Sequence, residues 1–399
     1  MEDFRFVNKT DIRFGKNHID AELHDAVAQF GQNVLLTYGG GSIKRSGLYE
    51  RVMKALEGLN VTELDGIEPN PKIDSVREGQ RLAKENDIDV ILAVGGGSVI
   101  DASKVIASAK FYDGDAWDLV ADHGVKYRSK LDQLPVVDIL TLAATGTEMN
   151  PGSVISNPEL NAKIGTYGPN TPAVSFLDPQ LTYSVSKWQT AAGSIDIFSH
   201  LTEQYFDRAE NTDISDGMIE GMMRAVIKWA PVALATPYNY DARANLMWAS
   251  TMALNGLVRS GNVNGWTVHP IEHELSAFYD ITHGVGLGIL TPRWMKRALS
   301  AATVAKFARF GRNVWDIQDA DDQVVAEKAI QATYDWVKSL EVPTTLQGVD
   351  INDETNFRAM AESAVEIGGL DHEGGYVNLT VDDVVALYQA SMTTDGFED

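Results

Sequence analysis

The chain has 399 residues, 44% of them hydrophobic, which is enough for two or three domains with ordinary buried cores. It contains no cysteine, which excludes disulfides, thiolate metal ligands and cysteine nucleophiles. The net charge of −23 argues against a nucleic-acid partner, because contacts to phosphates need clustered lysine and arginine.

The N-terminus and the hydropathy of the chain predict a cytoplasmic protein without a membrane partner. The first residues, MEDF, are acidic and lack the basic-then-apolar order of a signal peptide. No stretch approaches the roughly 20 apolar residues that a membrane span requires.

The first half alternates apolar runs with amphipathic stretches. Buried strands are predicted at 33–38, 87–94 and 135–142, and helices at 46–58 and after Gly97. Continuous apolar strands separated by helices indicate a parallel sheet that is covered on both faces. Ligands of such sheets bind at the carboxyl ends of the strands, where this chain has glycine-rich loops.

The loop after the first strand, GGGSIKR at 39–45, bears on the choice of cofactor. A dinucleotide with a free ribose 2′-hydroxyl usually meets an acidic residue after a strand. Here glycine and serine occupy that position, with Lys44 and Arg45 close by. This composition suits a 2′-phosphate and predicts NADP(H) over NAD(H). Alternatively, the two cations belong to a solvated helix start.

The loop after the second strand, GGGS at 95–98, is followed by Asp101 and Lys104. Glycines let the backbone approach a pyrophosphate, and the helix that follows offers free amides and the positive end of its dipole. The run is neither G-x-G-x-x-G nor a P-loop. The alternative is a tight strand-to-helix turn.

The third strand ends in a hydroxyl-rich turn, TLAATGTE at 141–148. Its threonine hydroxyls are suited to bind a phosphate or the nicotinamide amide. The alternative is a turn that satisfies its own backbone groups.

Helical patterns dominate after Asp178-Pro179. Apolar residues recur at spacings of three and four over 213–230, 240–258 and 322–340. Ser186, followed by Gln189 three residues later, predicts a helix start with a capping box.

These two patterns of hydrophobic residues predict two domains, an α/β domain over residues 1–182 and an all-helical domain over 183–399. A cleft between two such domains is a common place for a ligand. Residues 393–399 show no pattern and are expected to fray.

The histidines suggest a metal site in the helical half. Three of the 8 histidines fall between 269 and 283, and Asp196 precedes His200 by four residues, which places both on one helix face. One carboxylate and three imidazoles suit a divalent metal such as Fe(II) or Zn(II), and these ligand types do not choose between the two. For each histidine taken alone, an ordinary core or surface position is the favoured interpretation, and only the set points to a metal.

Taken together, the motifs resemble the iron-containing (group III) alcohol dehydrogenases. The resemblance rests on GGGSxxDxxK at 95–104, TxxATGTE at 141–148, Asp178-Pro179, DxxxH at 196–200 and HPxxHxxxxxxxxxH at 269–283. The run TYGGGSIKRSG at 37–47 resembles the branch of butanol dehydrogenases and NADPH-dependent aldehyde reductases. The resemblance covers nearly the whole chain.

The resemblance implies a dehydroquinate-synthase-like fold, with an α/β dinucleotide-binding domain and an all-α metal-binding domain. It implies a metal held by Asp196, His200, His269 and His283, with His273 near the nicotinamide. It further implies cofactor contacts from three groups of residues: Gly39, Gly40, Gly41, Ser42 and Lys44; Gly96, Gly97, Ser98 and Asp101; and Thr141, Leu142, Thr145, Thr147 and Lys163.

The expected activity is a metal-dependent, NAD(P)H-linked interconversion of small primary alcohols, such as butanol, and their aldehydes. The metal would polarise the substrate oxygen while hydride moves to or from the nicotinamide. His273 would relay the proton, since imidazole titrates in a suitable range, or would only shape the pocket. The family and the frequency of twofold assemblies favour a homodimer.

Other interpretations of the sequence retain the same fold or the same binding sites but change the function. A glycerol dehydrogenase or a sugar-phosphate cyclase would share this architecture, and a non-catalytic sensor would bind NADP(H) without turnover. A cyclase needs basic residues for its substrate, and the helical half shows no dense cluster of them. The stretch after Gly368, with Asp371, His372 and Glu373, does not match the family pattern and leaves the substrate open.

Overall fold

The structure is a computed structural model that describes the chain except residues 170, 264, 373, 374, 395 and 399. The chain divides into two compact units, Val7–Val185 and Ser186–Asp399, and the second unit also takes in Met1–Phe6. The predicted limits at 182 and 183 differ from this division by three residues and by the N-terminal segment. That segment joins the second unit through backbone bonds, such as the one from Glu2 N–H to the Gly261 carbonyl (2.9 Å).

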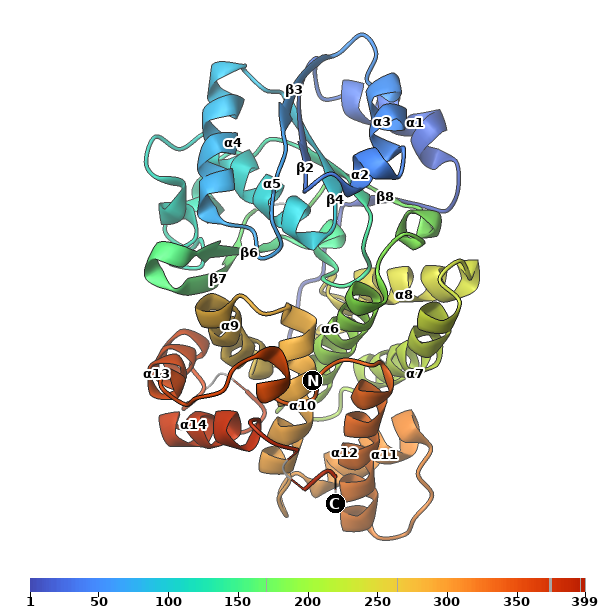
Figure 1. The fold of residues 1–399 in the computed structure, drawn as a ribbon, viewed down its shortest axis with the longest axis vertical. Coiled ribbons are helices and arrows are strands. Elements are labelled where there is room, and N and C mark those ends of the chain that lie inside the picture. Colours follow the sequence, from blue (N-terminus) through green and yellow to red (C-terminus); the bar gives the residue numbers. More distant parts are fainter. Residues whose placement is uncertain (170, 264, 373–374, 395, 399) are drawn as a thin grey trace. The chain divides into compact units, whose positions relative to one another are not determined.

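The α/β unit is built on a six-stranded parallel sheet (Figure 1), which confirms the predicted fold class. In spatial order its strands are β1 (Asp11–Phe14), β8 (Val174–Leu177), β5 (Val136–Leu140), β4 (Val90–Gly95), β2 (Asn33–Tyr38) and β3 (Asn60–Leu64). Every pair of neighbouring strands runs parallel. A separate antiparallel hairpin joins β6 (Gly152–Asn157) to β7 (Ala162–Tyr167).

Helices cover both faces of this sheet, as its continuous apolar strands require. Figure 1 shows α1 (His18–Ala28) and α3 (Leu48–Ala55) on one side and α4 (Ile73–Glu85) and α5 (Gly97–Ala109) on the other. Short helical segments complete the unit: α2 (Ser42–Arg45), η1 (Ala116–Leu119), η2 (Arg128–Lys130), η3 (Thr147–Met149), η4 (Pro158–Leu160) and η5 (Pro179–Thr182).

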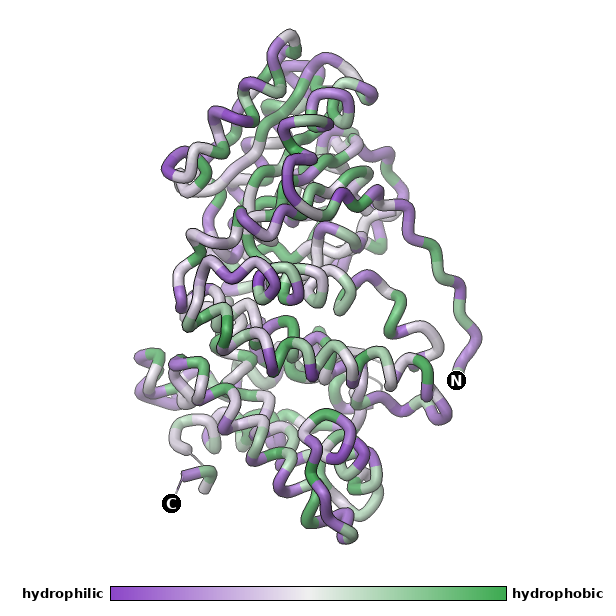
Figure 2. The backbone as a smooth tube through the Cα atoms, turned by 90° about the vertical axis from the view of Figure 1, so that its right-hand side faces the viewer, coloured by the Kyte–Doolittle hydropathy of each residue, from purple (hydrophilic) through white to green (hydrophobic). Residues whose placement is uncertain are grey.

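In the second unit, all the regular secondary structure of the described residues is helical. Its helices are α6 (Lys187–Tyr205), α7 (Asp213–Ala235), α8 (Tyr240–Ala253), α9 (Val268–Tyr279), α10 (His283–Ala298), α11 (Val304–Trp315), α12 (Asp322–Ser339), η6 (Gln347–Val349), α13 (Phe357–Gly368) and α14 (Val381–Ala390). Figure 2 shows that the chain carries both hydrophobic (green) and hydrophilic (purple) residues along its helices. Among the described helices, none combines the length and apolar character needed to cross a membrane.

Helix α6 is the central element of this unit. Every residue from Thr190 to Tyr205 is buried, so the helix has no solvent-facing side over that length. It packs against α7, α8 and α10. The predicted start at Ser186 is confirmed, because its hydroxyl accepts a hydrogen bond from Gln189 N–H (3.2 Å). The capping box is only half formed, since the described residues show no return bond from the Gln189 side chain to the Ser186 backbone.

Phe397, near the C-terminus, packs into the helical unit. Phe397 is only 8% exposed and stacks on Tyr334 with ring centroids 4.3 Å apart. The ammonium of Lys296 lies 3.6 Å from the centre of the same ring. The expected fraying of residues 393–399 is therefore wrong at Phe397, because a single buried aromatic leaves no periodic pattern to read.

Candidate metal centre and cofactor loops

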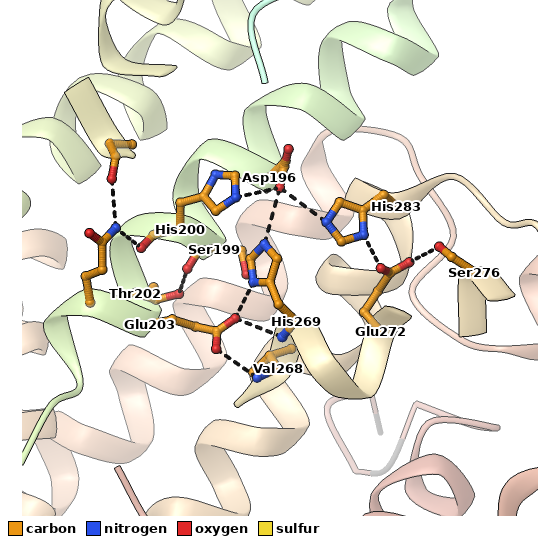
Figure 3. Close-up of polar contacts among 12 residues, drawn as sticks. Asp196, Ser199, His200, Thr202, Glu203, Val268, His269, Glu272, Ser276 and His283 are labelled. Atoms are coloured by element: carbon orange, nitrogen blue, oxygen red, sulfur yellow. Dashed lines mark hydrogen bonds and ion pairs between the residues drawn. The ribbon is translucent and has the colours of Figure 1, made fainter. Parts of the chain in front are cut away.

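The four predicted metal ligands converge inside the helical unit (Figure 3). Asp196 and His200 share one face of α6, and His269 and His283 come from the first turns of α9 and α10. The distances from Asp196 Oδ1 to the Nε2 atoms of His200, His269 and His283 are 3.5, 3.7 and 3.7 Å.

These separations are too long for hydrogen bonds and suit an ion between the groups. Two ligands held about 2.0–2.2 Å from a tetrahedral ion lie roughly 3.4 Å from each other. Asp196 Oδ1 and His269 Nε2 are both buried, and neither has a hydrogen-bond partner among the described residues. Buried polar atoms are rarely left unpaired, so the arrangement fits a divalent cation.

Two carboxylates that sequence reasoning missed orient the imidazoles. Glu203 Oε1 contacts His269 Nδ1, and Glu272 Oε2 contacts His283 Nδ1. A carboxylate on Nδ1 favours the tautomer whose Nε2 lone pair is free to bind a metal. Glu203 also accepts hydrogen bonds from Val268 N–H (2.9 Å) and His269 N–H (3.0 Å) at the start of α9.

The spacing of these carboxylates was the available signal. Glu203 follows Asp196 by seven residues on a predicted helix, which places it on the same face. Glu272 lies between two histidines in the HPIEH run at 269–273. Recognising either residue required knowing how α9 and α10 pack against α6.

Burial and charge act differently on the ligands of the metal-free protein. Burial lowers the pKa of His200 to about 4, so its imidazole is neutral at pH 7. Burial alone would also lower the pKa of His269, but the carboxylates of Glu203 and Asp196 outweigh it and raise the pKa to about 9. Burial would raise the pKa of Asp196, yet the three histidines hold it below its usual range. A bound cation would displace the proton from His269.

His273 lies beside the ligand cluster on α9. Its ring centroid is 6.1 Å from that of His269 and 5.4 Å from that of His283. It is half-buried, whereas His200 and His269 are buried. With Glu272 and His283, it forms a second group of potential ligand atoms that lie within 4.8 Å of one another.

In the α/β unit, the loops after β4 and β5 pack directly on each other. A Cβ atom at Gly97 would lie 2.3 Å from Thr145 Oγ1, and one at Gly96 would lie 3.2 Å from Leu142 Cβ. Only glycine allows this approach at Gly97. Gly97 is the first residue of α5, so the loops meet where the unpaired amides of that helix begin.

Asp101 holds the turn after β5 in place. Its Oδ1 accepts a hydrogen bond from the Thr147 hydroxyl, and its Oδ2 accepts one from Val154 N–H (2.9 Å). Lys104 Nζ donates to the carbonyls of Thr147 (2.9 Å) and Asn150 (3.0 Å). Both oxygens of Asp101 are thus engaged within the unit, which gives this residue a bracing position.

Two other predicted cofactor residues occupy different settings. Thr141, directly after β5, donates its backbone N–H to the Gly95 carbonyl (2.9 Å), which joins this turn to the loop after β4. Lys163 lies on β7 and is only 5% exposed, which is unusual for lysine.

The loop after β2 combines open space with two exposed cations, Lys44 and Arg45. Gly41 has a φ of +94° and precedes α2, which Ser42 begins. No atom lies within 4 Å of a Cβ built at Gly40, whereas one at Gly39 would lie 3.1 Å from a carbonyl oxygen. Lys44 is exposed, and its ammonium lies 4.9 Å from the ring centres of both Tyr38 and Tyr49.

The unmatched stretch after α13 is partly described. Asp371 Oδ1 contacts His372 Nδ1, and both side chains are exposed. The His372 carbonyl accepts a hydrogen bond from Arg208 (3.3 Å). Glu373 lies outside the described residues.

Sequence comparisons cover both units. The family described as iron-containing alcohol dehydrogenase matches residues 9–179, and its C-terminal counterpart, the Fe-containing alcohol dehydrogenase family, matches residues 190–392. The chain is 44% identical to NADH-dependent butanol dehydrogenase A of Clostridium acetobutylicum, over 98% of this chain and 100% of the relative. It is 36% identical to the NADPH-dependent aldehyde reductase YqhD of Escherichia coli, again over 98% and 100% of the two chains.

A structural comparison agrees with the sequence matches. The crystal structure of NADH-dependent butanol dehydrogenase A from Thermotoga maritima superimposes with a TM-score of 0.90 at 34% identity, covering 98% of this chain and 99% of the other. Both units therefore have counterparts in one family of oxidoreductases. The chain belongs to the iron-containing alcohol dehydrogenase family.

Proposed function

We propose that this protein interconverts primary alcohols such as butanol with their aldehydes, using a nicotinamide cofactor and one divalent metal, Fe(II) or Zn(II). The observation that carries the proposal is the cluster of the buried Asp196, His200 and His269 and the half-buried His283, whose three Nε2 atoms face one carboxylate oxygen. The relatives described as butanol dehydrogenases and aldehyde reductases support the choice of substrate class.

Each residue of the cluster has a definite task in this proposal. Asp196 and the three histidines would hold the ion, which when bound supplies electrostatic stabilisation for negative charge on the substrate oxygen. Glu203 and Glu272 keep the Nε2 atoms of His269 and His283 directed at the cluster. The loops after β4 and β5, with the amides at the start of α5, would bind the pyrophosphate of the cofactor.

The proposal is tested by turnover of butyraldehyde under anaerobic conditions, with chelated protein resupplied with Fe(II) or Zn(II). We expect oxidation of NADPH or NADH that depends on the added metal. Tight cofactor binding without turnover, across a panel of aldehydes and alcohols, would contradict the proposed reaction.

We further propose that NADP(H) is preferred over NAD(H). The loop after β2 supports this preference, because it has no acidic residue, leaves open space at Gly40 and carries the exposed Lys44. The relatives give support in both directions, since YqhD is described as NADPH-dependent and the butanol dehydrogenases as NADH-dependent. A direct measurement on this chain therefore decides between the two cofactors.

Gly40→Asp is expected to shift the preference towards NADH. The new carboxylate would repel a 2′-phosphate and would accept a hydrogen bond from a free ribose hydroxyl. We expect the ratio of kcat/KM for NADPH to that for NADH to fall by about tenfold or more, which corresponds to about 1.4 kcal/mol. Gly40→Ala is the matched control, because it adds a Cβ in the same open space without charge. A ratio that is equal in the two variants would contradict the role of this loop.

His273 is proposed to move the alcohol proton towards solvent. Its ring lies beside those of His269 and His283, and it is half-buried, whereas His200 and His269 are buried. His273→Ala is expected to lower kcat by roughly tenfold to a hundredfold and to change the pH profile of kcat. His24→Ala, an exposed histidine on α1, should change neither quantity. Full turnover with an unchanged profile in His273→Ala would remove this residue from the mechanism.

We also propose that the protein forms a homodimer, the commonest symmetric assembly. Sedimentation equilibrium at micromolar concentration measures the mass directly. A monomeric mass of 43.6 kDa would contradict the proposal.

A further inference from the structure

His200 differs from the other two histidines of the cluster in how its ring is held. His269 and His283 each have a carboxylate on Nδ1. His200 Nδ1 is buried and has no hydrogen-bond partner among the described residues. Metal-binding histidines almost always use their second ring nitrogen in such a bond, so some other contact has to fix the orientation of this ring.

Two aromatic contacts are available to His200. Its ring stacks on that of His269, with centroids 4.7 Å apart and planes 19° from parallel. The indole of Trp266 meets it edge to face at 5.8 Å and 85°. Trp266 also contacts His269, at 5.0 Å and 67°. The indole therefore lies against two of the four ligands, of which His269 already has a carboxylate on Nδ1 and His200 has none.

Residues on either side of Trp266 bond to α6 or to Asp207 just beyond it. Before Trp266, Asn262 Nδ2 donates to the Gln204 carbonyl (2.7 Å), and Val263 N–H donates to Asp207 Oδ1 (3.0 Å). After it, Val268 N–H donates to Glu203 Oε2 (2.9 Å). These acceptors lie on or just beyond the helix that carries Asp196 and His200, so the indole keeps a fixed position relative to the ligands.

We infer that Trp266 is a positioning residue of the metal centre. Its indole holds the ring of His200 in place by aromatic packing, whereas the rings of His269 and His283 are each held by a carboxylate. The inference rests on the proposed function only for the ligand set, because it concerns metal affinity and not turnover. It predicts that the indole acts through His200. It also predicts that another aromatic ring at this position can replace the indole.

The test measures Zn(II) affinity of the purified metal-free protein by competition with a chromophoric chelator. We expect Trp266→Ala to weaken binding by about tenfold or more, as loss of an orienting group typically does. Trp266→Phe should remain within about threefold of the parent protein. Trp248→Ala, which removes a 43% exposed tryptophan from α8, is the matched control and should leave affinity unchanged. The melting temperature of each metal-free variant shows whether a loss of affinity comes from a loss of folding.

A double-mutant cycle separates positioning from general loosening of the site. If Trp266 acts through His200, Trp266→Ala should have little further effect on Zn(II) affinity in a His200→Ala background. It should keep its full effect in a His283→Ala background, because no contact between Trp266 and His283 is seen within the described residues.

Three outcomes would overturn the inference: an affinity of Trp266→Ala within threefold of the parent, an equal loss in Trp266→Phe, or an undiminished effect without His200. A parent protein that binds Zn(II) but turns over no alcohol or aldehyde would contradict the proposed reaction. The comparison of Zn(II) affinities among the Trp266 variants would still be valid. A parent protein that binds neither Zn(II) nor Fe(II) would contradict both.

Discussion

Asp196→Ala is expected to abolish metal binding and to lower kcat/KM by roughly 10³-fold or more, because the metal's charge stabilisation is worth several kcal/mol. Asp196 Oδ1 is the atom that the Nε2 atoms of His200, His269 and His283 all face, at 3.5–3.7 Å. Removing it takes the only negative charge out of the ligand set. The loss should appear both in metal content, measured by atomic emission, and in turnover.

The design of this experiment separates charge from volume. Asp196→Asn keeps the size of the side chain and removes the charge, so it should also lose most of its metal. Asp241→Ala, at an exposed position on α8, should retain wild-type metal content and activity. An Asp196→Ala protein with full activity and full metal content would contradict the assignment of the ligands.

Gly284→Ala is expected to destabilise the helical unit and to weaken metal binding. A Cβ at Gly284 would lie 2.0 Å from the carbonyl oxygen of Ala192 and 2.6 Å from its carbonyl carbon. These are backbone atoms of α6, so relief requires α10 to move away from α6. His283 precedes this glycine and Asp196 lies one turn after Ala192, so the movement would separate two of the predicted ligands.

Overpacking of this kind costs about 1–3 kcal/mol or more, and we expect the melting temperature to fall by at least several degrees. Thermal unfolding followed by circular dichroism and Zn(II) titration measure the two effects. Gly217→Ala is the matched control, since this exposed glycine of α7 has no atom within 4 Å of a new Cβ. Because alanine favours helix over glycine, the control should be unchanged or slightly more stable. Equal melting temperatures for the two variants would contradict the role of the α6–α10 contact.

Where the sequence carried a strong local pattern, its predictions were accurate. The apolar run at 33–38 forms β2 with the predicted limits, and the run at 135–142 contains β5. The helix predicted at 322–340 is α12, Asp322–Ser339. Burial on both faces makes such strands uniformly apolar, and a half-buried helix shows a regular spacing.

Other features could not be predicted, because they depend on backbone geometry or packing that a short stretch of sequence does not reveal. The helix predicted over 46–58 is the shorter α3 (Leu48–Ala55), which begins only after Gly47, because the φ of +77° at this glycine interrupts helical geometry. The polar edge strand β3 gave no apolar run, because much of its length is partly exposed. Glu203 and Glu272 could be recognised only from the packing of α6, α9 and α10, because each carboxylate contacts a histidine of a different helix.

The spacing of functional groups along α6 limits how this protein can change. Asp196, His200 and Glu203 stay on one face because successive residues of a helix turn by about 100°. Inserting or deleting one residue between them would rotate part of the set by that angle, away from α9 and α10. The helix is buried throughout this stretch, so no solvent-facing turn can absorb the extra residue. The number of residues between Asp196 and Glu203 is therefore fixed by the geometry of the ligand set.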